Sequence, residues 1–121
     1  MEILVEMDNN VIILKPIGRL DASNAGSLQA QVAKLIEKKY LYILLDMGRV
    51  DFMDSTGLGT CIGIHKKLAA TGGALVCAVA SEAVRSLFHL TRTDEKVTIA
   101  ASRFEALQIL QDKVLQGGAR I

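Results

Sequence analysis

Short strand-like runs alternate with helix-like segments along this chain of 121 residues, and this alternation limits the possible folds more than any other feature. The predicted strands are residues 3–7, 11–17, 42–46, 74–80 and 97–100, and the predicted helices are residues 24–38, 55–70, 82–90 and 103–115. Strand–helix–strand units favour parallel pairing, whereas the short turn at residues 8–10 allows only an antiparallel first pair. The sequence therefore predicts an α/β fold, in which a mixed, mostly parallel sheet with an antiparallel N-terminal edge hairpin packs against about four helices.

Turn and capping residues support this division of the chain. Gly72 and Gly73 end the second predicted helix, and Ser102 with Glu105 matches a capping box at the start of the last one. Residues 48–55 are expected to form a loop between a strand and a helix. We predict a single domain over residues 1–115, followed by a frayed tail at residues 116–121.

Composition argues against several classes of function. The net charge is +1, from 14 basic and 13 acidic residues, which gives no electrostatic reason to expect nucleic acid or a membrane surface as a partner. Hydrophobic residues make up 50% of the chain and aromatic residues 4%, so the core must be aliphatic. Cys61 and Cys77 lie in apolar segments, which fits a reduced, cytoplasmic protein better than a disulfide framework. No apolar run approaches the about 18 residues of a membrane span, and residues 1–7 do not resemble a signal peptide.

Patterns for catalysis and metal binding are weak. Cys61 and His65 have the spacing of half a metal site, but no second pair of ligands is evident. The glycines that follow Ser55 do not lead into the Gly-Lys-Ser/Thr of a phosphate-binding loop. Neither histidine lies in a loop near Ser55, so this hydroxyl lacks a base that would make it a nucleophile. We expect no metal, no cofactor and no catalytic residue.

Three loops are expected at one edge of the sheet, because they follow the carboxyl ends of parallel strands. These loops are residues 18–24, 48–55 and 81–82. They would bring together three carboxylates and two hydroxyls, namely Asp21, Asp51, Asp54, Ser55 and Ser81. We take this acidic rim as the expected functional site.

Residues 51–59 join a strand to a helix and are the most informative segment of the chain. Ser55 and Thr56 fall in the first helical turn, where free N–H groups and the helix dipole favour a phosphate. Two glycines in the same turn remove bulk, so that another protein could approach closely. The alternative is structural: Asp54 or Ser55 only caps the helix, and the glycines only pack.

The run Asp54-Ser55-Thr56-Gly57-Leu58-Gly59 resembles the signature of the anti-sigma factor antagonists of the STAS domain family. The resemblance covers residues 3–112 and includes Gly18-Arg19-Leu20-Asp21, Phe52-Met53, Gly63 with Lys66, Gly72-Gly73 and the VRSLF run at residues 84–88. Residues 89–94 depart from the family, which commonly has an Asp and a Gly-Leu pair after its third helix.

The resemblance implies a regulatory binding protein that is not an enzyme. Such antagonists bind an anti-sigma factor, a serine kinase of the GHKL ATPase type, and thereby release a sigma factor. The kinase phosphorylates the antagonist and ends binding, and a PP2C-type phosphatase removes the phosphate. In this chain the implied phosphorylation site is Ser55, with Thr56 as the secondary candidate. The implied partner-binding residues are Asp21, Asp54, Thr56, Gly57, Leu58 and Gly59.

Two alternatives stay open from the sequence. Many STAS domains are subunits of transporters or sensory complexes, in which Ser55 would rarely be modified. A small enzyme that uses the acidic rim, for example in phosphoryl chemistry, is the alternative from a different class. The missing base and the missing phosphate loop argue against it.

Overall fold

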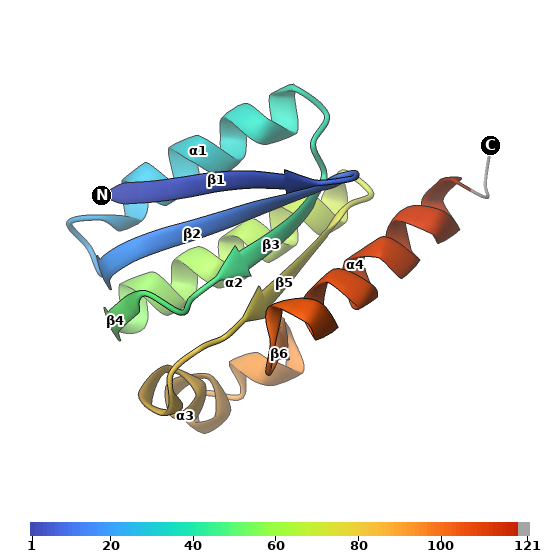
Figure 1. The fold of residues 1–121 in the computed structure, drawn as a ribbon. Coiled ribbons are helices and arrows are strands. Elements are labelled where there is room, and N and C mark those ends of the chain that lie inside the picture. The colour runs from blue at the N-terminus through green and yellow to red at the C-terminus, as the bar shows by residue number, and fades with distance from the viewer. Residues whose placement is uncertain (119–121) are drawn as a thin grey trace.

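A computed structural model that describes residues 1–118 contains six strands and four α-helices, in the order β1-β2-α1-β3-β4-α2-β5-α3-β6-α4 (Figure 1). The strands are β1 (Glu2–Asp8), β2 (Val11–Leu20), β3 (Tyr42–Asp46), β4 (Val50–Met53), β5 (Ala74–Ala78) and β6 (Thr98–Ala100). The helices are α1 (Ala25–Glu37), α2 (Ser55–Ala70), α3 (Glu82–Leu90) and α4 (Arg103–Gly118), with a short 3-10 helix η1 (Thr93–Glu95).

The sheet has the strand order β1-β2-β3-β5-β6, and β4 pairs with β2 beside this path. The β1–β2 pair is antiparallel, and the other pairs are parallel. Asn9 takes the left-handed conformation in the tight turn of the first pair, with φ at 55°. The predicted α/β fold, with its edge hairpin and mostly parallel sheet, is confirmed.

The expected loop at residues 48–55 was wrong in part, because Val50–Met53 forms strand β4. β2 continues to Leu20, three residues beyond its predicted end, and so extends past the end of its pairing with β3. β4 pairs with this extension, with Gly18 opposite Val50 and Leu20 opposite Met53. The pairing places the end of β2 directly beside the start of α2.

Two apolar cores lie on opposite faces of the sheet. One core packs the sheet against α1, α2 and α3 and includes Leu28, Leu68 and Phe88. The other packs it against α4 through Ala106 and Leu110. Alternate residues of β2 enter different cores, since Ile12 and Leu14 face the first and Val11 and Ile13 the second. Because β2 is buried on both faces, it holds the segment that follows Leu20 in a fixed position.

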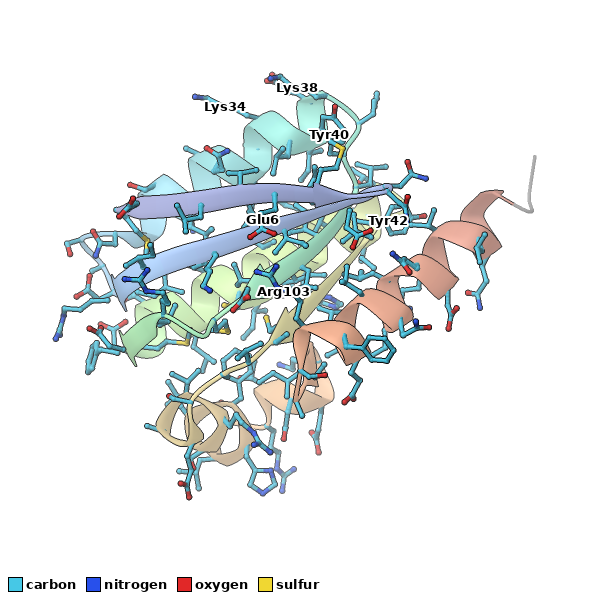
Figure 2. The ribbon with its side chains drawn as sticks, viewed as in Figure 1. Glu6, Lys34, Lys38, Tyr40, Tyr42 and Arg103 are labelled. Atoms are coloured by element: carbon cyan, nitrogen blue, oxygen red, sulfur yellow. The ribbon has the colours of Figure 1, made fainter. Side chains whose placement is uncertain are left out.

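Helix α4 is tied to the sheet at its first residue. Arg103 reaches from α4 across the sheet face to Glu6 on β1 and Asp46 on β3 (Figure 2). Its guanidinium nitrogens lie 3.0 Å from a Glu6 carboxylate oxygen and 2.8 Å from an Asp46 oxygen. These contacts join an edge strand, a central strand and the last helix.

The predicted tail at residues 116–121 begins inside this helix. α4 runs to Gly118, three residues past its predicted end, and residues 119–121 lie outside the described part of the chain. Within residues 1–118, no helix combines the length and apolar character needed to cross a membrane.

Candidate functional site

The start of α2 is fixed by Asp54, which caps the helix. One carboxylate oxygen of Asp54 accepts hydrogen bonds from the backbone N–H groups of Thr56, at 3.0 Å, and Gly57, at 3.1 Å. The Asp54 carbonyl accepts a third bond from the Leu58 N–H at 3.0 Å. The expectation that a phosphate would find free donors at this helix start is therefore wrong for Thr56 and Gly57, whose N–H groups already have an anionic partner.

Ser55 and Thr56 both lie exposed in the first turn of α2, directly after the half-buried Asp54. The cap holds the backbone around them, so the two hydroxyl-bearing residues stand on a rigid element. Ser55 thus meets the geometric requirement for modification by another protein, which is an accessible side chain at a fixed position.

The two glycines of this turn have different surroundings. A Cβ atom on Gly57 would overlap the Leu20 carbonyl oxygen and would lie 2.9 Å from Cγ of Met53. Gly57 is needed because the helix packs directly against the ends of β2 and β4. A Cβ atom on Gly59 would have no heavy atom within 4 Å, and Gly59 is exposed. Internal packing explains why residue 57 is glycine. At Gly59 the missing side chain instead leaves open surface.

Leu58 points into the molecule. Its exposed fraction is 6%, and it belongs to the core beneath α1, α2 and α3. Its place in the motif therefore reflects anchoring of the helix start, which supports the exposed residues on either side of it.

Asp21 stands next to the motif because of the strand register. Leu20 of β2 pairs with Met53 of β4. Asp21 directly follows Leu20 and Asp54 directly follows Met53, so the two aspartates leave the sheet side by side. The Asp21 carboxylate accepts hydrogen bonds from the Ser23 hydroxyl at 2.6 Å, the Ser23 N–H at 3.1 Å and Arg19 Nε at 3.2 Å. The bonds from Ser23 and Arg19 lower the pKa of Asp21 below its ordinary value, so the group is ionised at neutral pH.

Arg19 and Phe52 form a part of this surface that the sequence did not predict. The two residues pair across β2 and β4, and the Arg19 guanidinium lies 4.0 Å from the centre of the Phe52 ring. Phe52 is 39% exposed. Aromatic and arginine side chains of this kind dominate binding energy at many protein interfaces. The rim is consequently less acidic than expected, since Arg19 offsets the charge of Asp21.

The remaining residues of the expected rim are more dispersed. Asp51 is exposed on β4. Ser81 follows β5, which β3 separates from β2, and its hydroxyl accepts a hydrogen bond from the Val84 N–H at 3.3 Å as the cap of α3. The site at the start of α2 is thus made from the ends of β2 and β4, and Ser81 supports a different helix.

The cysteines of this protein are buried, and its described metal-ligating side chains are dispersed. In the described part of the chain, no three His, Cys, Asp or Glu side chains are grouped closely enough to hold a metal ion. Cys61 and Cys77 are free and buried. A hydrogen bond with the Cys61 thiol, together with burial, raises the pKa of Cys77 well above its ordinary value, so that the thiol stays protonated at neutral pH.

Comparison with known proteins places this geometry in a family. The sequence profile of the STAS domain matches residues 2–106. The anti-sigma-B factor antagonist of Bacillus subtilis is 30% identical over 97 residues, which span 80% of this chain and 88% of that protein. The crystal structure of TM1081 from Thermotoga maritima has a TM-score of 0.85 and 27% identity, covering 90% of this chain and 94% of that one.

A further structure has the same fold at lower identity. The Bacillus cell fate determinant SpoIIAA in its phosphorylated form has a TM-score of 0.68 and 23% identity, covering 88% of this chain and 97% of that one. The matched profile spans most of the chain, from β1 into α4, and includes the capped start of α2. The chain belongs to the STAS domain family, and its relatives include anti-sigma factor antagonists.

Proposed function

We propose that this protein is a cytoplasmic anti-sigma factor antagonist controlled by phosphorylation of Ser55. In the unmodified state it binds an anti-sigma factor that is a serine kinase of the GHKL ATPase type, and a sigma factor is released. Phosphorylation ends this binding, and a PP2C-type phosphatase restores it. The observation that carries the proposal is the exposed Ser55 side chain, held on a capped helix start beside Asp21 and the Arg19–Phe52 pair.

The protein itself supplies only the acceptor for the phosphoryl group. The Ser55 oxygen forms a bond to the γ-phosphorus of ATP, the bond between the β- and γ-phosphoryl groups breaks, and ADP leaves. The hydroxyl proton passes to a base of the kinase. No catalytic group of this chain is required, which agrees with a regulatory rather than an enzymatic role.

The surroundings of Ser55 favour an electrostatic switch. A phosphate adds about −1.5 to −2 charges at neutral pH. The N–H groups of Thr56 and Gly57 are already bonded to Asp54, so they do not compensate this charge. A partner that docks on this surface would meet a new, poorly neutralised anion. A loss of about 3 kcal/mol in binding free energy would weaken the complex more than a hundredfold.

The acceptor residue can be tested directly with single variants. Incubation with the cognate kinase and ATP should add one phosphate to the wild type and to Thr56→Ala, but none to Ser55→Ala. Mass spectrometry of the intact protein and of its peptides measures the result. Phosphate found on Thr56 in the wild type, or undiminished incorporation into folded Ser55→Ala, would contradict the assignment.

A further inference from the structure

The outer edge of β1 combines unpaired backbone groups with exposed apolar side chains. β1 pairs with β2 along its whole length, from Glu2 to Asp8, and lies at the end of the sheet with no strand beyond it (Figure 1). Three of the nine exposed large apolar side chains lie in this strand of seven residues: Leu4 at 42%, Val5 at 49% and Met7 at 57% exposure.

Neither helical layer covers this edge. Leu4 lies on the α4 side of the strand. There α4 packs over β3 and β5 (Figure 1), and the hydrogen bonds that it makes to β1 are those of Arg103 to Glu6 and of Gln111 to Asp8, at 3.5 Å. Val5 and Met7 lie on the opposite side, and their exposure shows that α1 does not cover them. Apolar side chains on both faces therefore flank a row of backbone groups that can still pair with another strand.

Acidic side chains are the main protection that the edge of β1 has. Proteins block such edges with charged side chains, above all lysine, and with prolines, bulges or very short strands. Residues 2–8 contain no lysine, arginine or proline, and their register with β2 has no shift. The charged residues of the strand are Glu2, Glu6 and Asp8, all of which are acidic. The edge is thus open and carries charge of one sign.

This charge pattern disfavours a second copy of the chain as the occupant. A symmetric antiparallel pair of β1 strands has three registers that join five residues or more. These place Glu2 opposite Glu6, Glu2 opposite Asp8, or Glu6 opposite itself. Like charges directly opposite each other destabilise strand pairing. A strand with basic residues would instead be attracted, as Arg103 already is to Glu6 at 3.0 Å.

We propose that the free edge of β1 binds an extended segment of another polypeptide, in which basic and apolar residues alternate, as an added strand of the sheet. Backbone hydrogen bonds would provide affinity, and the contacts of basic side chains with Glu2 and Asp8 would provide selectivity. β2 lies between this edge and β4, so the surface is separate from the start of α2 and can be occupied independently of Ser55.

A defined peptide tests this site. A hexapeptide of alternating lysine and valine is titrated into the full chain, and amide chemical shifts are followed by NMR. We expect the shifts to concentrate on β1 and β2. The Glu2→Lys/Asp8→Lys variant should bind at least tenfold more weakly, whereas Glu37→Lys/Asp112→Lys, with the same change in net charge on α1 and α4, should lose less than threefold. A peptide N-methylated at every residue should not bind, because neither of its edges can then donate backbone hydrogen bonds.

Several results would overturn the proposal. Shifts confined to other elements would place the binding site elsewhere. An equal loss in both charge-reversed variants would show attraction to net charge alone, and undiminished binding of the N-methylated peptide would exclude strand addition. Concentration-dependent dimerisation through β1 would identify a second copy as the occupant. Circular dichroism of each variant shows whether the fold is retained.

Discussion

Gly57 and Gly59 are two residues apart in the same turn of α2, but one faces the sheet and the other faces solvent. The backbone of α2 approaches the Leu20 carbonyl so closely that only hydrogen fits at residue 57. At residue 59 the space is open. Although both glycines lower helix propensity, only Gly57 has a packing reason for doing so. Open surface at Gly59, beside the proposed phosphorylation site, leaves room for a docking partner.

Alanine substitutions should separate these two roles. Gly57→Ala forces a Cβ atom against backbone, and we expect it to lower the free energy of unfolding by about 1–3 kcal/mol. Gly59→Ala meets no obstacle and should raise it by up to about 1 kcal/mol through helix propensity. Urea denaturation of both variants measures the difference. Equal destabilisation by both alanines would show that the close approach of α2 to β2 is not as described.

Val79 is a residue-scale feature with a stability consequence. It follows β5 with φ at 62°, in the left-handed region that β-branched residues rarely adopt. Asparagine tolerates this conformation, and Val79 is 38% exposed, so the asparagine amide can reach solvent. We expect Val79→Asn to raise the thermal midpoint by a few degrees, corresponding to about 0.5–1 kcal/mol. A lower midpoint than that of the wild type would contradict this.

At the scale of elements, the contacts of Arg103 connect α4 to the sheet through two unequal carboxylates. The Asp46 side chain is 5% exposed and also accepts the Gly48 N–H at 2.9 Å, whereas the Glu6 side chain is 53% exposed. Removing a partner from a buried charge is costly, and exposed pairs contribute little. The contribution of Arg103 to stability therefore depends mainly on the buried Asp46 and less on the exposed Glu6.

Three variants measure this asymmetry. Arg103→Met should destabilise the protein by about 1–3 kcal/mol, because Asp46 loses its cation while remaining buried. Glu6→Gln should cost less than about 1 kcal/mol, since that carboxylate is half solvated. Arg85→Met, at an exposed position of α3, serves as a control. A loss for Glu6→Gln as large as that for Arg103→Met would refute the ranking.

Local periodicity accounts for what could be predicted about the elements. The helices and most strands follow from patterns within a few residues, and the hairpin follows from a short turn. β4 could not be predicted in this way, because Val50–Met53 is a strand only by pairing with the end of β2, whose residues lie 32 or 33 positions earlier in the chain. The exposed Ser55 and the Asp54 cap depend on local sequence. The Arg19–Phe52 contact depends on the β2–β4 pairing, and so it was missed.

For the molecule as a whole, pH dependence should reveal the electrostatics of the rim. The pKa of Asp21 is lowered in the folded state, so between its folded and unfolded values the unfolded chain binds more protons and stability rises with pH. Its contribution is therefore present at neutral pH and lost as pH falls below about 3.8. Asp21→Asn should flatten this acidic part of the stability curve, measured by urea denaturation at several pH values. An unchanged slope would contradict the ionised, hydrogen-bonded state of Asp21.

The whole molecule has two candidate binding surfaces, which lie at different sides of one sheet. In our proposals, the start of α2, supported by β2 and β4, presents Ser55 for reversible modification, and the outer edge of β1 is a separate site for strand addition. The proposed switch needs no large rearrangement of the sheet between them. Added charge at one side chain changes the surface that a partner meets.

The affinity of the phosphorylated protein for its kinase tests the central claim most directly. Protein phosphorylated at Ser55 and unmodified protein are each titrated calorimetrically into the cognate GHKL kinase at physiological salt. The account predicts tight binding of the unmodified protein and at least a hundredfold weaker binding after phosphorylation, with the fold unchanged by circular dichroism. Equal affinity of the two forms would contradict it.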